Sequence, residues 1–185
     1  TTVELAKLLK QLNVDFARLP ESDFDNPLGM STGAADIFGH TGGVMEAALR
    51  TAADTLTGKD LKEIDYTEIR SMKEIKEAEL DIAGKKIKIC VVHTLGAARK
   101  LLEQIKQGKS PYHFIEIMAC YGGCIGGGGQ PPPHSREMLK KRTKALITVD
   151  EKKKIRKSHK NPAVIKLYKE YLGKAGSEKA HKLLH

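Results

Sequence analysis

Two cysteines in a glycine-rich loop are the residues of this sequence best suited to chemistry. Cys120 and Cys124 are separated by three residues, and six glycines lie between Gly122 and Gly129. Thiolates are soft ligands for zinc and for iron–sulfur clusters, and neighbouring glycines let backbone N–H groups approach a sulfur or a small anion. Zinc knuckles need two cysteine pairs, whereas this loop offers one. The pattern predicts half of a metal-cluster site.

The rest of the chain offers few further ligands for this site. A cubane cluster takes four protein ligands, and the third cysteine, Cys90, lies in an apolar stretch that predicts a buried strand. Because free cysteine is commonly a core residue, Cys90 is interpreted as a small buried hydrophobe. The seven histidines show no ligand spacing. Met118, two residues before the first thiol, either packs in the core or places its polarizable sulfur beside a cofactor. An odd cysteine count favours reduced thiols over a disulfide framework.

A second candidate site begins at Phe38 and Gly39. The run continues through Gly42 and Gly43 into a strong helix pattern over residues 44–56. The first N–H groups of a helix have no partner within it, and they suit an anion. The sequence therefore predicts open N–H groups at Gly42 and Gly43 that face a negatively charged ligand.

The elements that must position these residues alternate between helices and strands. We expect helices over residues 2–12, 44–56 and 95–107, a long loop over 20–33, partly extended structure over 67–82, and strands over 86–93 and 113–118. A strand, a helix and another strand followed directly by a functional loop are typical of an α/β domain, in which ligands gather beyond strand ends. The cysteine loop occupies that position.

The C-terminal tail carries the basic excess of the chain. Residues 136–185 hold 16 Lys and Arg against five Asp and Glu, whereas residues 1–135 hold 16 against 18. We expect helices from residue 135 to about 157, from 162 to 172 and after 177, and we divide the chain into residues 1–149 and a helical extension, 150–185. Runs of lysine can bind phosphates non-specifically, but a solvated helix face or a contact with an acidic protein is favoured because no stacking aromatics accompany the run. Binding to nucleic acid is therefore not expected.

No apolar run approaches the roughly 20 residues that span a bilayer, and the first residues show no signal-peptide pattern. We accordingly expect no membrane span. The chain starts at Thr1 rather than at methionine, which suggests a mature or excised segment of something longer.

Three stretches resemble the iron-only (FeFe) hydrogenases. Residues 114–131, FIEIMACYGGCIGGGGQP, resemble the third cysteine motif of that family. Residues 38–50, FGHTGGVMEAALR, resemble the glycine-rich helix start of its catalytic domain. Residues 167–173, LYKEYLG, and 181–185, HKLLH, resemble its small-subunit-like C-terminal extension. The resemblance covers nearly the whole chain.

This resemblance implies an α/β lobe of the hydrogenase catalytic domain, with a mixed sheet flanked by helices and a helical C-terminal tail. It also implies an H-cluster, a 4Fe–4S cubane bridged to a di-iron unit that carries CO, cyanide and a dithiolate. By position, Cys120 would ligate the cubane, and Cys124 would both ligate it and bridge to the di-iron unit. Met118 would pack near the bridge. The distal iron pocket would be lined by Phe38, Gly39, Gly42 and Gly43.

The family's two upstream cysteine motifs have no counterpart in this sequence, so no complete catalytic set is present. The resemblance implies that a complementary N-terminal half supplies the other ligands, and that ferredoxin or another redox carrier exchanges electrons with the cluster. It implies a cytoplasmic protein, with the periplasm as the other compartment. Two alternatives stay open: a hydrogenase-like protein of iron–sulfur assembly or sensing that holds only ordinary clusters, and a basic binding module in which the cysteines are structural.

Overall fold

A computed structural model describes residues 1–22 and 30–184, and its central element is a three-stranded mixed sheet. The strands follow the order β1-β2-β3, in which β1 and β2 are antiparallel and β2 and β3 are parallel. The strands are β1 (Ile75–Ile82), β2 (Lys85–His93) and β3 (Phe114–Met118). The helices in the described part are α1 (Thr2–Gln11), α2 (Gly33–Asp36), α3 (Gly43–Thr57), α4 (Leu95–Lys106), α5 (Arg136–Lys152), α6 (Pro162–Leu167) and α7 (Glu178–Leu184).

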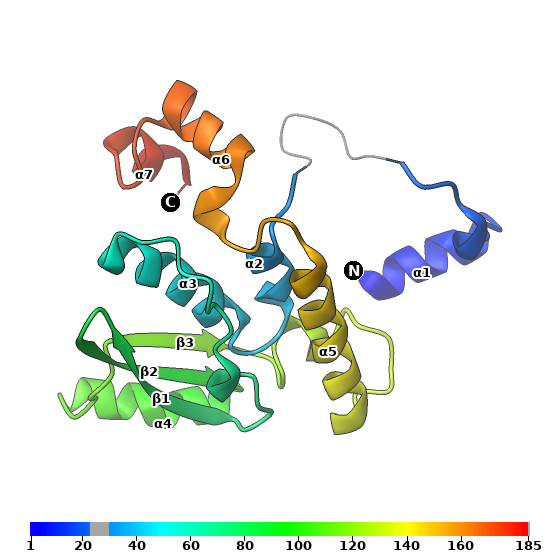
Figure 1. Ribbon diagram of the computed structural model, residues 1–185. Coiled ribbons are helices and arrows are strands. Elements are labelled where there is room, and N and C mark those ends of the chain that lie inside the picture. Colours follow the sequence, from blue (N-terminus) through cyan, green and yellow to red (C-terminus); the bar gives the residue numbers. More distant parts are fainter. Residues whose placement is uncertain (23–29, 185) are drawn as a thin grey trace.

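The sheet is covered by a helix on each face, as Figure 1 shows. Side chains alternate along β2, because successive residues of a strand point to opposite faces. Ile89 and Val91 pack with Met45 and Leu49 of α3, and the other face of β2 packs against α4. The result is a three-layer α/β arrangement, which confirms the predicted fold class.

Cys90 lies on the α4 face of the sheet, and its exposed fraction is 0%. Burial raises the pKa of its thiol to about 11 because a thiolate loses its hydration there. The interpretation of Cys90 as a core residue is confirmed.

Most predicted element boundaries agree with the structure to within one or two residues. The helix expected over 44–56 is α3, which ends before Gly58 in the left-handed conformation, φ 64°. The strands expected over 86–93 and 113–118 are β2 and β3. Part of the long loop expected over 20–33, residues 23–29, lies outside the described residues.

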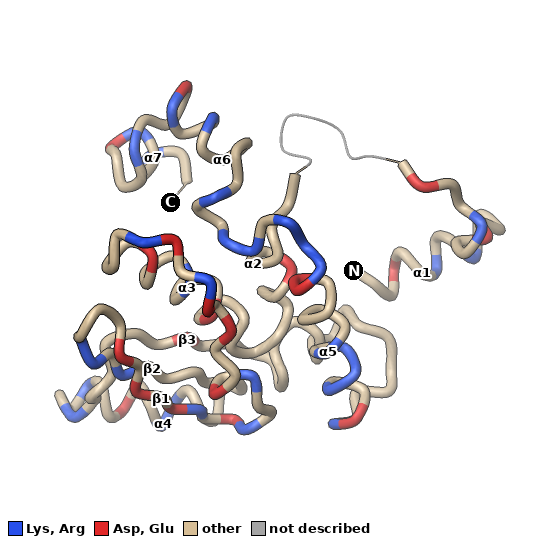
Figure 2. Tube along the Cα trace, viewed as in Figure 1, with Lys and Arg blue, Asp and Glu red and all other residues tan. Residues whose placement is uncertain are grey.

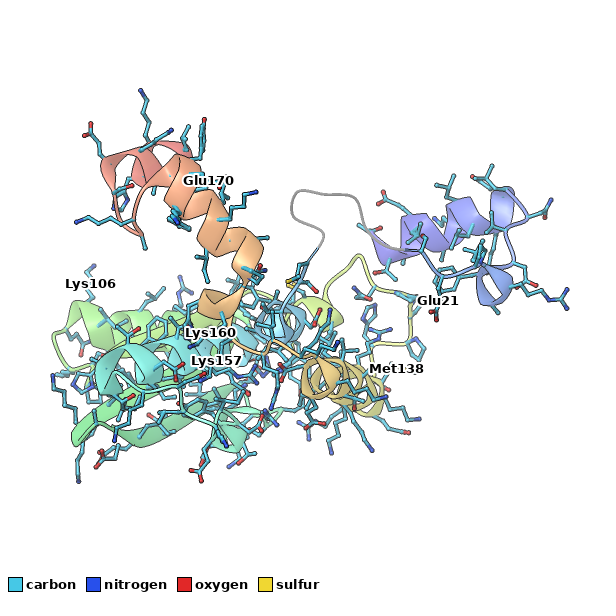
Figure 3. All side chains as sticks on the ribbon, turned by 45° about the horizontal axis from the view of Figure 1, so that its top comes forward. Glu21, Lys106, Met138, Lys157, Lys160 and Glu170 are labelled. Atoms are coloured by element: carbon cyan, nitrogen blue, oxygen red, sulfur yellow. The ribbon has the colours of Figure 1, made fainter. Side chains whose placement is uncertain are left out.

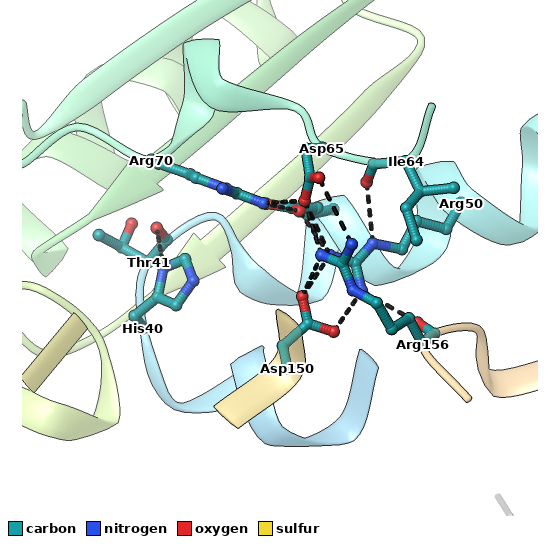
Figure 4. A network of polar contacts seen from close by, with 9 residues as sticks. His40, Thr41, Arg50, Ile64, Asp65, Arg70, Asp150 and Arg156 are labelled. Atoms are coloured by element: carbon teal, nitrogen blue, oxygen red, sulfur yellow. Dashed lines mark hydrogen bonds and ion pairs between the residues drawn. The ribbon is translucent and has the colours of Figure 1, made fainter. Parts of the chain in front are cut away.

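The helix expected from residue 135 to about 157 is too long, because α5 ends at Lys152 and residue 153 is extended, with ψ 138°. The reason is a buried ion network, shown in Figure 4. Arg156 turns back toward α5 and places a guanidinium nitrogen 2.6 Å from Asp150. A continued helix would carry this side chain away from its partner. The extended segment lets the basic run meet carboxylates inside the protein.

This α3–tail ion network joins α3 to the tail. Its members are Glu46 and Arg50 of α3, Asp65 and Arg70 of the following connection, and Asp150 and Arg156 of the tail. Three carboxylates of the network lie within 4.8 Å of one another, which is close enough for a metal ion. Three guanidinium groups already neutralise them, so the network is a set of ion pairs rather than a cation site.

A second pair of contacts strengthens the same junction. The ammonium nitrogen of Lys157 lies 2.8 Å from both carboxylate oxygens of Asp54 and 2.7 Å from Asp60. Figure 3 shows Lys157 and Lys160 at the foot of α6, beside the body of the molecule. Part of the basic run that we interpreted as a solvated face is therefore internal.

Candidate metal centre

The cysteine loop leaves the sheet at the carboxyl end of β3, where the α/β layout predicts a site. Cys120 and Cys124 are both free and exposed. Gly122 and Gly123 have φ angles of 80° and 92°, which side chains other than glycine rarely adopt. A Cβ at Gly127 would lie 3.6 Å from the sulfur of Cys120. The loop therefore presents two sulfurs in surroundings that glycine keeps open.

Several glycine N–H groups of the loop already have partners within it. Gly123 donates to the carbonyl of Cys120, Gly126 to that of Gly123, and Gly127 to that of Cys124, each at 3.0 Å. The expectation that loop glycines direct N–H groups toward sulfur does not hold for these three. They instead form consecutive tight turns that fix the positions of both cysteines.

The cysteine loop touches the loop that precedes α3. An ideal Cβ at Gly123 would lie 2.8 Å from the amide nitrogen of Thr41, 2.9 Å from the sulfur of Met118 and 3.0 Å from the carbonyl oxygen of Gly39. The N–H of Thr41 donates to the carbonyl of Gly122 over 3.0 Å. The structure thus brings together three features that the sequence singled out separately: the cysteines, Met118 and Gly39.

Phe38 directly precedes Gly39 in the segment before α3. Its side chain is 45% exposed, and it lines a shallow apolar hollow along α3 with Val44, Ala47 and Ala48. Its assignment to an iron pocket stays a prediction.

The start of α3 does bind an anion, but the anion belongs to the chain. The carboxylate of Glu116 on β3 accepts the N–H of Gly42 at 2.6 Å and that of Met45 at 2.7 Å. Gly43 donates to the carbonyl of His40. The prediction of open N–H groups at Gly42 and Gly43 is therefore wrong, because an internal carboxylate and a turn satisfy them.

Glu116 itself is only 8% exposed. Burial raises the pKa of its carboxyl group, and the N–H groups of Gly42 and Met45 and the charge of Lys76 oppose that rise. These short hydrogen bonds hold the carboxylate of Glu116 at the N-terminus of α3, which is the positive end of the helix dipole. Glu116, four residues before Cys120, thereby connects β3 to α3.

Lys76 supports the same contact from β1. Its side chain is 3% exposed, and its ammonium group donates to the carbonyl and the hydroxyl of Thr41 at 2.9 and 3.0 Å. Burial lowers the pKa of Lys76 to about 8, against an opposing effect of Glu116. Lys76 therefore orients Thr41, whose N–H holds Gly122 of the cysteine loop.

His93, at the end of β2, holds the other side of the Gly122 peptide. Its Nδ1 accepts the N–H of Gly122 at 3.1 Å, so the proton of the neutral ring resides on Nε2, which donates to the carbonyl of Lys73 at 3.0 Å. Burial lowers the pKa of His93, which keeps the ring in this neutral form. The ring also meets Tyr121 edge to face, with centroids 4.8 Å apart.

The far part of the cysteine loop is held by α5 and α1. Arg142 of α5 donates to the carbonyls of Ile125 and Pro131 at 2.7 and 2.6 Å. The N–H of Val3 in α1 donates to the carbonyl of Gly129. The loop is thus braced by β1, β2, α1 and α5 as well as by the strand from which it emerges.

Sequence reasoning missed the positioning residues Lys76, Thr41 and His93. Each had a faint signal: a charged residue in a strand pattern, a hydroxyl beside the helix-start glycines, and a histidine at a strand end. None of these signals identifies its partner, because the partners lie 29 to 35 residues away. Glu116 lies two residues before Met118 in β3 and therefore on the same face of the strand, but its role as the helix cap needs the tertiary fold.

Two family models together match almost the whole chain. The model for the C-terminal domain of the iron-only hydrogenase large subunit matches residues 1–128. The chain belongs to the iron-only hydrogenase family. A second model, for the iron hydrogenase small subunit, matches residues 136–185. The division of the chain between residues 149 and 150 stays a prediction, and α5 runs through it without a break.

Curated hydrogenases align along the full chain. It is 55% identical over 186 residues to the NADP-reducing hydrogenase subunit HndD of Solidesulfovibrio fructosivorans and 43% identical over 190 residues to iron hydrogenase 1 of Clostridium pasteurianum. Both alignments cover 100% of this chain but only 32% and 33% of the relatives. The chain therefore spans about a third of the length of these curated relatives.

Solved hydrogenase structures share the fold. An FeFe-hydrogenase structure concerned with oxygen inactivation of the H cluster superposes with a TM-score of 0.77 at 39% identity, covering 99% of this chain and 52% of that one. A variant of an FeFe-hydrogenase from Chlamydomonas reinhardtii gives 0.78 at 39% identity, covering 100% and 53%. The chain is also 30% identical over 190 residues to the cytosolic Fe–S cluster assembly factor narfl of Danio rerio, an alignment that covers 100% of this chain and 46% of that one.

The donor set of this chain fits part of an iron–sulfur cluster site. Cys120 and Cys124 have free, exposed sulfurs, and a Cβ at Gly127 would lie against the sulfur of Cys120. Cys90 is unavailable, because it is fully buried on the α4 side of the sheet. Of the three cysteines in the chain, two are therefore accessible, whereas a cubane takes four thiolates.

Proposed function

We propose that this chain is the C-terminal lobe of an FeFe hydrogenase that interconverts hydrogen with protons and electrons. The observation that carries the proposal is the cysteine loop: two exposed sulfurs at a strand end, with the Gly122 peptide between them fixed by His93 and Thr41. Such bracing is what a metal site needs from its surroundings. Membership of the iron-only hydrogenase family supports hydrogen chemistry at an iron–sulfur centre as the function of this loop.

In this proposal Cys120 and Cys124 hold the cubane, and Cys124 also bridges to the di-iron unit. Met118 lies against Gly123, so its thioether packs beside the position assigned to that bridge. Gly39 and Gly42 form the opposite wall with Phe38 at its edge. The H-cluster, when bound, supplies the redox and proton chemistry of hydrogen, and the residues of this chain hold it, exclude water and keep its ligands in place.

The remaining ligands come from a complementary N-terminal half in this proposal. Exposed apolar side chains in and just after α1 support such a partner: Leu5 and Leu8 lie in α1, Leu12 and Phe16 follow it, and all four are between 49% and 71% exposed. Contiguous exposed apolar surface marks interaction sites. In Figure 1, α1 stands apart from the body of the molecule. We propose that the other lobe packs on these side chains and that ferredoxin or a similar carrier exchanges electrons with the assembled enzyme.

The described residues contain no helix long and apolar enough to cross a bilayer. One curated relative, from Nitratidesulfovibrio vulgaris, is named a periplasmic Fe hydrogenase large subunit. A cytoplasmic location for this protein remains part of the proposal, with the periplasm as the alternative.

The test combines this chain with its complementary half and matures the complex anaerobically. We expect hydrogen evolution with a reduced carrier, together with infrared bands of metal-bound CO and cyanide. Cys124→Ala should abolish both, whereas Cys90→Ala, at the buried cysteine, should keep the bands. A complex with neither bands nor hydrogen evolution would refute the proposal.

The assembly-factor alternative is supported by the 30% identity to narfl along the whole chain. The 55% identity to a hydrogenase subunit favours the first proposal. The same experiment separates the two, because an assembly-type protein would show 4Fe–4S signals in electron paramagnetic resonance without CO or cyanide bands.

A further inference from the structure

We propose that a cleft between α5 and residues 70–73 binds a small phosphate-bearing anion. The cleft has a volume of about 620 Å³, which is within the usual range for small-molecule sites. One wall is a single face of α5, and the other is the connection that leads from the α3–tail ion network to β1. This site is separate from the metal centre and does not depend on the proposed hydrogenase activity.

The charge of the cleft is the first argument. Arg136, Lys140 and Lys144 follow one another at helical-turn spacing on α5, and Lys73 lines the opposite wall. In the described part of the chain, none of these four side chains forms an ion pair with a carboxylate. Figure 2 shows the basic positions along α5. Like charges four residues apart destabilise a helix, and an anion in the cleft would relieve that repulsion.

The contrast with the neighbouring cations is the second argument. Arg70, at the edge of the same cleft, is paired with Glu46 and Asp65, and Lys141, on the outward side of α5, is paired with Glu137. Arg70 and Lys141 thus have carboxylate partners. Lys73, Arg136, Lys140 and Lys144 line the cleft without such a partner among the described residues, although Glu151 lines its far end.

The other lining groups favour a phosphate over a simple halide. Ser71 and Thr148 add hydroxyl groups to the walls, and Met72 and Ile147 add apolar surface. Hydroxyl and ammonium donors together match the several acceptor oxygens of a phosphate. The apolar surface suits the body of an organic phosphate, so free phosphate and a phosphate ester are the two sources to distinguish.

The cleft also adjoins the cysteine loop. Arg136 donates to the hydroxyl of Tyr121 at 3.3 Å, and the sulfur of Met72 lies 3.7 Å from an ideal Cβ at Gly122. The carbonyl of Lys73 accepts from His93. An anion in the cleft would therefore contact residues that touch Tyr121, Gly122 and His93.

The test titrates the purified protein with inorganic pyrophosphate and, separately, with AMP, by calorimetry and by amide chemical shifts. We expect saturable binding in the millimolar range or tighter, with shifts at Lys73, Lys140 and Tyr121. Tighter binding of AMP identifies an ester site, and tighter binding of pyrophosphate identifies an inorganic site. The double variant Lys140→Gln, Lys144→Gln should weaken binding roughly tenfold.

The matched control is Lys141→Gln, Lys152→Gln, which removes the same charge from the same helix outside the cleft. We expect its affinity to stay within about twofold of the unaltered protein. Equal weakening by both pairs would show non-specific attraction and overturn the proposal. So would the absence of saturable binding for both probes, or binding of an acidic peptide alone.

Discussion

Arg50 offers the sharpest test of how the tail is attached to the domain. Its side chain has an exposed fraction of 0%, and its guanidinium makes five hydrogen bonds: to the carbonyls of Ile64 and Arg156, to Glu46 and twice to Asp150. Replacement by methionine keeps most of the volume and removes every one of these bonds. The variant Arg50→Met therefore isolates the electrostatic part of the junction.

The expected loss follows from what the variant leaves behind. Asp150 keeps Arg156 and Glu46 keeps Arg70, so neither carboxylate becomes fully unpaired. The two carbonyls lose their donors, at about 1 kcal/mol each, and the remaining buried charge imbalance adds a similar amount. We expect the free energy of unfolding to fall by about 3 kcal/mol, at the lower end of the range for broken buried ion pairs.

The assay is urea denaturation followed by circular dichroism, with hydrogen exchange at residues 153–157 as a local readout. Adding Asp150→Leu to Arg50→Met removes the charge on both sides and should recover about 1 kcal/mol relative to the sum of the single variants. Lys141→Met, which breaks an exposed pair with Glu137, should change stability by less than about 0.5 kcal/mol.

A loss below about 1 kcal/mol for Arg50→Met would refute this reasoning, since it would place the network among surface ion pairs. Strict additivity, in which the double variant loses the sum of the two single-variant losses, would do so as well. It would mean that methionine fails to pack, rather than that carboxylates lose a partner.

Three further predictions concern the site and its surroundings. Gly123→Ala should lower cluster incorporation by iron analysis, because its Cβ would lie 2.9 Å from the sulfur of Met118; full incorporation would contradict the contact. Burial lowers the pKa of Lys76 from 10.5 to about 8, so the unfolded chain holds one more proton between these values and stability should rise with pH across that window, by up to about 3 kcal/mol. Lys76→Met should remove that rise in pH-dependent denaturation, and an unchanged slope would exclude Lys76 as its source. Neutralising the exposed Lys152 and Lys154 should raise the apparent KM for an acidic carrier such as ferredoxin, and an unchanged KM would count against docking there.

The elements that follow from local pattern were predictable from the sequence. The apolar run that forms the buried strand β2 and the glycine that ends α3 depend on residues close in the chain, and both agree with the structure. Cys90 was also placed correctly in the core, because a free cysteine within an apolar strand is commonly buried. The cysteine loop was recognised because its chemistry lies in contiguous residues.

The predictions that failed concerned contacts between residues far apart in the sequence. The N–H groups at Gly42 were expected to be open, but their acceptor, Glu116, is 74 residues away. The helix expected to reach residue 157 stops at Lys152 because Arg156 pairs with Asp65, in the connection after α3, and with Asp150 of α5 itself. Charge pattern alone shows that a lysine or arginine is present. It does not show whether the fold uses that charge internally.

The cap that Glu116 places on α3 has a consequence for the position of the cysteines. β3 is short and lies at the edge of the sheet, paired only with β2, so few backbone bonds prevent it from sliding. A slip of one residue would turn Glu116 to the opposite face and present Ile117 to the start of α3. The N–H groups of Gly42 and Met45 would then lose their acceptor. The carboxylate therefore acts as a register lock: the strand can pair in one alignment only, and Cys120, four residues later, always leaves the sheet at the same point.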